Sequence, residues 1–308
     1  IRSAKHVRRN GTSPPRGASG RREGEARGKE NRSSSEEDDP WINLTTGTWP
    51  SPFFLLWADS IWRGGGDTGA VPRSMLADLT LRQRWIIWRE LLVWRNVVKR
   101  ASFFPLAQLM IHGVVVGLHG EALLRGLHQH THLDFAQEAW SFVGMGLQLQ
   151  ELYLSPSLLQ AADWANLAEA LKWSRANLDV LRDSHWVLGG FEDLQPYGVA
   201  SWRPAIPGKP ARGFLMLRNP LGRRQETGLF TLDSVLELPS REIGLALQVE
   251  VVRSLSDGPQ RLGCALGKPR HASGAGRGAC VVEASKQMSV AMRPVEVLIL
   301  DLRPLDQS

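Results

Sequence analysis

The sequence predicts an α/β region followed by an all-β region. Between residues 41 and 190, strand-like runs alternate with helix-like runs, which is typical of a parallel sheet. Beyond residue 190, short extended runs are separated by turn-prone stretches such as Asn219-Pro220, which favours an antiparallel β-sandwich. All twelve tryptophans also lie between Trp41 and Trp202. We therefore predict three segments, namely a tail at 1–40, an α/β domain at 41–190 and a β-sandwich at 191–308.

The tail is predicted to be disordered because it combines dense charge with almost no large apolar side chain. The chain has 37 Lys and Arg against 31 Asp and Glu, a formal charge of +6, and residues 1–40 carry much of that excess. Basic and acidic residues are mixed in this tail, so we expect no nucleic-acid partner. No apolar run reaches the roughly 18 residues that span a bilayer, and we expect no membrane partner either.

The α/β domain is predicted element by element. A short strand at 41–46 is followed by a helix at 80–100 capped by Thr80, because Leu81, Trp85, Trp88 and Leu92 form one apolar stripe. Arg82, Arg89 and Lys99 are expected to lie away from that stripe. The continuous apolar run at 109–116 predicts a strand covered on both faces. A helix at 134–143, a strand at 147–154 and a helix opened by Ser157 or Asp163 and ending before Gly189 complete the domain.

The β domain is predicted from seven short extended runs. They lie at 197–202, 213–218, 228–238, 245–252, 279–284, 288–292 and 295–302. Cys264 and Cys280 are too few for a disulfide framework, and we expect two free thiols while leaving one disulfide open.

The run 41–69 carries the residue types of a sugar-handling site. Tryptophan rings can cover the apolar face of a sugar, carboxylates can supply acid, base or nucleophile, and glycines allow close approach of the backbone. The alternative is an aromatic core beside a glycine turn. Gly64-Gly65-Gly66 is not followed by the lysine and hydroxyl residue of a phosphate loop, so we expect no cofactor, and the sequence indicates no particular oligomeric state.

The order of these pieces resembles the C-terminal half of a retaining α-galactosidase-like glycoside hydrolase. The matching pieces are TTGTWPSP at 45–52, WADSIWRGGGDTG at 57–69, LRQRWIIWRELLVWRNVV at 81–98, LMIHGVV at 109–115, LQLQELYL at 147–154, SWRP at 201–204, FLMLRNP at 214–220 and FTLDSVLELP at 230–239. The resemblance implies part of a catalytic (β/α)8 (TIM) barrel followed by a C-terminal antiparallel β-sandwich. It also implies retaining hydrolysis of terminal α-linked sugars.

The chain departs from the family at both catalytic carboxylates. The acid/base aspartate of the family follows the tryptophan by three residues, a position held here by Gly65, and the nearest carboxylate is Asp67. The family's nucleophile lies upstream of every matching piece, where Asp38 and Asp39 sit in an acidic run without a strand. With about three βα units an eight-stranded barrel cannot close. We therefore expect a fragment or divergent member that lacks its nucleophile, with a non-catalytic carbohydrate-binding protein as the alternative.

Individual residues have a functional and a structural interpretation. Asp67 is the candidate acid/base, or a turn aspartate that bonds its own backbone. The candidate substrate-binding residues are Trp49, Asp59, Trp62, Arg63 and His112. Their structural alternatives include a salt bridge between Asp59 and Arg63 and a core histidine at His112. We expect a carbohydrate ligand.

Two further motifs remain open in the sequence. His128, His130 and His132 form HQHTH, whose spacing would suit zinc on one face of a strand. Loop geometry is the favoured interpretation, because no apolar alternation flanks the motif, and we expect no metal site. Glu151 could point into a site at the end of its strand, or form a buried ion pair.

Overall fold

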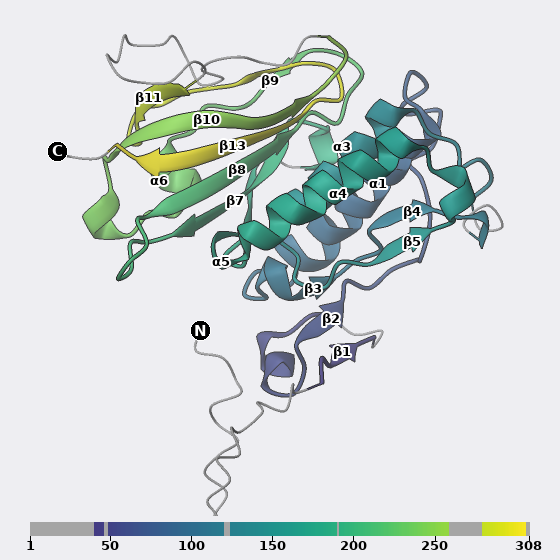
Figure 1. Cartoon of the computed structure of the whole chain (residues 1–308), viewed down its shortest axis with the longest axis horizontal. Helices are drawn as coiled ribbons and strands as arrows, with labels where there is room; N and C mark the ends of the chain where they lie inside the picture. Colours follow the sequence, from purple (N-terminus) through teal and green to yellow (C-terminus); the bar gives the residue numbers. More distant parts are fainter. Residues whose placement is uncertain (1–39, 46–48, 120–123, 190, 259–278, 306–308) are drawn as a thin grey trace, which may run out of the picture.

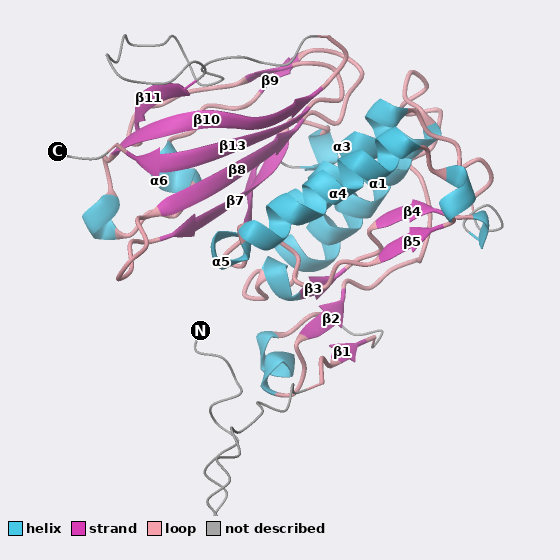
Figure 2. Cartoon of the chain, in the orientation of Figure 1, coloured by secondary structure: helices cyan, strands magenta, loops and turns pink. Residues whose placement is uncertain are grey.

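The computed structural model describes residues 40–45, 49–119, 124–189, 191–258 and 279–305. The predicted tail, Cys264, and the Gly/Ala/Ser stretch at 271–278 lie outside these ranges. Within them the helices form a layer between a large antiparallel sheet and the short parallel strands (Figure 1). Figure 2 shows the same division by element type, with the long strands gathered on one side of the helices.

The N-terminal strands are short and parallel. One sheet has the order β1-β2-β3 and a second pairs β4 with β5. Their bounds are β1 Asn43–Leu44, β2 Ser60–Trp62, β3 Leu109–Met110, β4 Val114–Val116 and β5 Leu152–Leu154. The described strands form open sheets and no closed barrel. The predicted α/β character is confirmed at this level.

The single strand predicted at 109–116 is wrong. Its two ends pair with different partners, because β3 lies beside β2 whereas β4 lies beside β5. The chain changes sheets at Ile111, His112 and Gly113, where a Cβ on Gly113 would overlap the carbonyl oxygen of Glu151. The glycine that makes the change possible had looked like part of a continuous apolar run.

One of the predicted helix caps is confirmed and another is wrong, since Thr80 caps α1 whereas neither Ser157 nor Asp163 caps α4. Thr80 accepts a hydrogen bond from the backbone N–H of Gln83 at 3.2 Å, which confirms it as a cap. The helix predicted to open at Ser157 or Asp163 is α4. Gln160 caps it, Asp163 lies three residues inside it, and it ends well before Gly189. The bounds are α1 Leu81–Val93, continued by a π-helical turn η4 Trp94–Val98, then α3 His132–Gly144, α4 Ala161–Ala176, α5 Leu178–Leu181 and α6 Leu232–Val235.

The C-terminal half is built on one six-stranded sheet. Its order is β11-β10-β13-β8-β7-β6, and every neighbouring pair in it is antiparallel. The bounds are β6 His185–Leu188, β7 Tyr197–Arg203, β8 Arg212–Arg218, β10 Ala246–Leu255, β11 Ala279–Glu283 and β13 Val297–Pro304. The sheet begins with β6, before the boundary placed at residue 190. The strand predicted at 228–238 is wrong, because this segment contains the short helix α6 at Leu232–Val235.

Each face of this sheet is covered differently. Met216 of β8 and Ile299 of β13 pack with Phe135 and Trp140 of α3, whereas Leu298 and Leu300 face a second core with Leu232 of α6. The strands therefore alternate between two buried faces. A small pair, β9 Gln225–Glu226 with β12 Ala291–Met292, completes the far side. Helices thus occupy the face on which a β-sandwich would place a second sheet.

The short helices connect these layers. In the described part of the chain five of them are 3-10 helices, namely η3 Pro52–Leu56, η5 Leu106–Gln108, η6 Pro156–Leu158, η7 Phe191–Asp193 and η8 Ser240–Glu242.

The expectation of two free thiols is wrong, because Cys280 of β11 is disulfide-bonded.

A buried ionic network joins α1 to α3 and to the sheet. Arg82 donates to Glu138 of α3 at 2.7 Å, and Arg89 lies 3.6 Å from the other oxygen of the same carboxylate. Arg218 of β8 reaches Glu90 at 3.5 Å. Arg82 and Arg89 are therefore buried as well as the apolar side chains of α1, because their guanidinium groups pair with carboxylates of the network.

Candidate functional site

Four of the predicted site residues meet at the carboxyl ends of β2 and β3. Trp62 is the last residue of β2 and Arg63 follows it, with its backbone N–H donating to the carbonyl of Met110 at 3.2 Å. His112 lies just beyond β3, and its ring meets the Trp62 indole edge to face at 4.7 Å between centroids. Parallel pairing of β2 with β3 brings these segments together across almost fifty positions of sequence.

Arg63 shapes the glycine loop that follows it. Its guanidinium lies 4.2 Å from the centroid of the Trp62 ring and donates to the carbonyl oxygens of Gly64 at 3.1 Å and Gly66 at 3.0 Å. Burial, and then the nearby charge of Arg89, lower the pKa of Arg63 to about 9. Arg63 is thus bound to the backbone of the loop and does not pair with Asp59.

The glycines are required by the packing of this loop against α1 and η4. Gly64 and Gly65 have φ of 71° and 102°, the left-handed region in which a side chain is strained. The side chain of Asn96 donates to the Gly64 carbonyl at 3.1 Å. A Cβ on Gly69 would overlap the indole of Trp88. The loop therefore has a fixed path, and it presents Asp67 to solvent.

Asp67 and His112 face each other across the cluster. Oδ1 of Asp67 lies 3.5 Å from Nε2 of His112, and the aspartate side chain is 72% exposed. Burial and the positive charge of Arg63 lower the pKa of His112, whereas Asp67 raises it. The imidazole is held between a buried cation and an exposed carboxylate.

Glu151 and Tyr153 extend the cluster from the neighbouring sheet. The Tyr153 ring lies 5.1 Å from the His112 ring, and its hydroxyl donates to Oε2 of Glu151 at 3.0 Å. Burial raises the pKa of Glu151, and burial with the Glu151 hydrogen bond raises the pKa of Tyr153 to about 12. Tyr153 was missed from the sequence, although its spacing of two from Glu151 on one strand is a signal for a shared face.

The other two predicted substrate-binding residues lie outside the cluster. Asp59 is at the opposite, amino end of β2, where its side chain accepts from the backbone N–H of Ile42 at 2.9 Å. Trp49 is about half exposed, and Arg100 stacks over its ring at 4.4 Å. Neither side chain shares a described contact with Asp67 or His112.

The histidine motif is part of a helix-capping arrangement. His132 and His130 lie 2.7 and 3.2 Å from the two carboxylate oxygens of Asp163, which also accepts from the backbone N–H of Gln160. The hydrogen bond that His132 donates to Asp163 raises the pKa of His132. Over the described ranges, no group of three or more ligating side chains has the geometry of a metal site.

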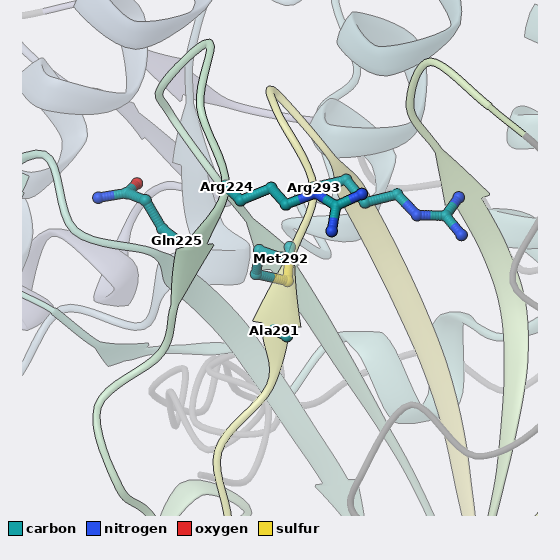
Figure 3. Close-up of a pocket in the computed structure, with 5 residues that line it drawn as sticks. All are labelled: Arg224, Gln225, Ala291, Met292 and Arg293. Carbon is teal, nitrogen blue, oxygen red and sulfur yellow. The ribbon is translucent and has the colours of Figure 1, made fainter.

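A shallow pocket of about 280 Å³ lies between β9 and β12, remote in sequence from the cluster. It is lined by Arg224, Gln225, Ala291, Met292 and Arg293 (Figure 3). In Figure 3 the two arginines extend to one side while Gln225 turns to the other.

None of the described helices combines the length and apolarity of a membrane span.

Comparison with known proteins gives matches among solved structures alone. No family model and no curated protein matches the chain. A "putative alpha-galactosidase" and a "putative alpha-galactosidase/melibiase", both from Bacteroides fragilis NCTC 9343, are 12% and 14% identical with TM-scores of 0.42 and 0.43. They cover 82% and 80% of this chain, which covers 44% and 43% of theirs.

A "putative alpha-N-acetylgalactosaminidase" from Bacillus halodurans C-125 is 12% identical, with a TM-score of 0.36 over 58% of this chain and 33% of that one. The chain therefore spans less than half the length of these structures. They belong to the class of protein that the sequence motifs resemble. Because the TM-scores are below 0.5, we base the proposed function on the site residues alone.

Proposed function

We propose that this chain is a fragment or divergent member of a retaining glycoside hydrolase that acts on terminal α-linked sugars. One observation carries the proposal, namely the meeting of Trp62, Arg63, Asp67 and His112 at the carboxyl ends of two parallel strands. Active sites of α/β proteins lie at that end of the strands. The strands β1 to β5 would then be part of a (β/α)8 barrel and the six-stranded sheet its C-terminal β domain.

The cluster offers the parts that glycoside hydrolysis requires. An exposed carboxylate at Asp67 can act at the anomeric centre, and an aromatic edge at Trp62 can border the ring of a bound sugar. His112, whose pKa is lowered, can hydrogen-bond a sugar hydroxyl in its neutral form. No cofactor is needed for this chemistry.

Hydrolysis of a panel of aryl α-glycosides tests the proposal. We expect release of the aryl alcohol by the purified chain and its loss in Asp67→Asn. The matched control is Asp78→Asn, which changes an aspartate on an exposed turn outside the cluster. Full activity in Asp67→Asn would remove Asp67 from the site, and inactivity of the unaltered chain on every glycoside would reject the hydrolase.

The second candidate is a non-catalytic carbohydrate-binding protein, favoured by exposed indoles near the N-terminal strands. Trp41, Trp49 and Trp57 are 48%, 52% and 60% exposed. Flat exposed rings of this kind can stack on sugar faces. Quenching of tryptophan fluorescence by sugars in a chain without hydrolytic activity would favour it, with Trp49→Ala as the diagnostic variant. No response to any glycan of a broad array would reject it.

A further inference from the structure

The pocket between β9 and β12 has the residue types of an anion-binding site. Of the five described residues that line it, two are arginines and none is acidic. Its volume of about 280 Å³ is close to the smallest volumes found for small-molecule sites. Figure 3 shows the side chains of Arg224 and Arg293 extending to the same side. Two guanidinium groups on one side of a pocket can bind a single anion together.

Arg224 is accessible to a ligand. It is an exposed residue directly before β9, and no carboxylate of the described residues forms an ion pair with it. Two arginines of the large sheet differ in this respect, because Arg212 and Arg303 both pair with Asp301. The charge and the donors of the Arg224 guanidinium are therefore not used by a carboxylate in the described part of the chain.

One buried side chain fixes the backbone beside both pocket arginines. Asn219 is fully buried, and its amide nitrogen donates to the carbonyl oxygens of Arg223 and Arg293, each at 2.7 Å. The backbone N–H of Arg293 also donates to the buried carboxylate of Glu296 at 2.8 Å. The two segments that carry the arginines are thus joined before a ligand binds, and such preorganisation lowers the cost of binding.

The segment after Arg293 contains a strained residue. Val295 has a φ of 45°, in the left-handed region that a β-branched residue rarely adopts. Its backbone N–H donates to the carbonyl of Leu221 at 2.8 Å, and its own carbonyl accepts from the side chain of Gln137 at 2.7 Å. Backbone strain that is held in this way clusters at functional sites, which favours a functional interpretation of the pocket.

The rest of the lining includes an apolar surface. Met292 is buried and pairs with Gln225 across the two strands, and Ala291 precedes it on β12. A thioether side chain adapts its shape to different apolar groups. A bare inorganic anion would leave this surface uncovered, whereas an organic ester would cover it. The lining therefore suits a ligand with both an anionic and an apolar part.

We propose that this pocket binds an organic phosphate monoester, with its oxyanion between Arg224 and Arg293 and its organic part over Ala291 and Met292. A phosphate monoester carries a charge of about −1.5 to −2 at neutral pH, which matches two arginines better than a single negative charge does. The inference goes beyond the proposed function and does not depend on it, because the pocket contains none of the residues of the cluster beside β2 and β3.

Isothermal titration calorimetry of the purified chain at about pH 7.5 and about 0.15 M salt tests the proposal. The probes are phenyl phosphate, phenyl sulfate, inorganic phosphate and phenol. We expect phenyl phosphate to bind most tightly. Phenyl sulfate has a similar shape with a single charge, inorganic phosphate lacks the apolar ring, and phenol lacks the oxyanion.

Arg224→Gln is the variant that tests the site, because it removes the charge without breaking a described ion pair. We expect the Kd for phenyl phosphate to rise by about 10–100-fold. Arg224→Lys keeps the charge without the planar fork of donors, and we expect an intermediate rise. Arg223→Gln is the matched control, since it removes the same charge from an exposed neighbour that does not line the pocket. Its Kd should stay close to that of the unaltered chain.

Circular dichroism and urea unfolding establish that each variant is folded. Equal rises in Kd in Arg224→Gln and Arg223→Gln would overturn the proposal, because attraction by general positive charge would then explain the binding. Failure of the unaltered chain to bind phenyl phosphate, or equal affinity for phenyl phosphate and inorganic phosphate, would overturn it as well. The hydrolysis of α-glycosides is measured separately, so this proposal and the proposed function can fail independently.

Discussion

Two groups of ionisable side chains in this protein contain similar residue types and have opposite environments. In the buried network that joins α1 to α3, Arg82, Arg89 and Glu138 are all fully buried and each contacts at least one partner of opposite charge. In the candidate site, Arg63 is equally buried, but Asp67 is 72% exposed and its nearest described partner is a histidine at 3.5 Å. Both groups are joined through Gly113, whose carbonyl accepts from Arg89.

This difference separates the charged side chains that stabilise the fold, in the buried network, from those that remain accessible to a ligand, in the candidate site. A fully buried carboxylate that accepts from several donors is not accessible to a substrate, and removing it leaves the buried guanidinium groups uncompensated. An exposed carboxylate on a loop that glycines and Asn96 hold in place contributes little to stability and remains accessible. The predictions below test this division in order of expected effect.

The largest effect should come from Glu138→Ala. Its carboxylate contacts Arg82 and Arg89 and accepts from the Trp85 indole at 2.9 Å, so its loss leaves buried donors without a partner. We expect the free energy of unfolding to fall by about 3–5 kcal/mol, measured by urea denaturation. Glu192→Ala removes the exposed pair with Lys99, and the loss of unfolding free energy there should be much smaller, because solvent screens that pair. Equal losses in the two variants would contradict the division.

Gly113→Ala should follow, because it acts where the two groups meet. The added methyl group would overlap the Glu151 carbonyl oxygen, which cannot move without disturbing the register of β5. We expect a loss of about 3 kcal/mol in unfolding free energy and, with it, a lower affinity or activity of the site. Gly228→Ala is the control, since no atom lies within 4 Å of its added Cβ. A Gly113→Ala variant as stable as Gly228→Ala would show that the close approach is dispensable.

The regular elements were predictable where local chemistry decides them. Thr80 caps α1 as expected, and the apolar runs of β7, β8 and β13 lie in the sheet. The failures have tertiary causes. The burial of Arg82 and Arg89 could not be predicted from the helix alone, because it depends on a partner distant in sequence, Glu138 of α3.

The site was predictable in part for the same reason. Trp62, Arg63 and Asp67 come from one segment rich in informative residues, and the pairing of β2 with β3 brings His112 to them. Tyr153 needed the pairing of β4 with β5, which no local pattern specifies. Asp59 and Trp49 shared the composition of the segment, but the direction of β2 places Asp59 at its other end and Arg100 covers Trp49.

A smaller effect is expected on the titration of His112 in Asp67→Asn. Asp67 raises the pKa of His112 through its charge and a hydrogen bond, against burial and Arg63, which lower it. Removing the charge should therefore lower the pKa of His112 further, as measured by NMR of the imidazole. The pKa of His112 in the folded state is below the ordinary value of 6.5. His112 therefore lowers the free energy of unfolding progressively as pH falls below 6.5, and this loss should be larger in Asp67→Asn. Asp59→Asn should leave the pKa of His112 unchanged, and an upward shift in Asp67→Asn would contradict the contact.

The smallest effect should be the pH dependence contributed by His132, whose side chain is about half exposed. The hydrogen bond that His132 donates to Asp163 raises the pKa of His132 above 6.5, so its stabilisation is present below that value and is lost as pH rises through the folded pKa. We expect His132→Asn to lower the unfolding free energy at about pH 5.5 and to leave it nearly unchanged at about pH 9. In an Asp163→Asn background the same substitution should have no pH-dependent effect. A loss of unfolding free energy that is equal at both pH values would mean that His132 stabilises this turn by packing and not by its charge.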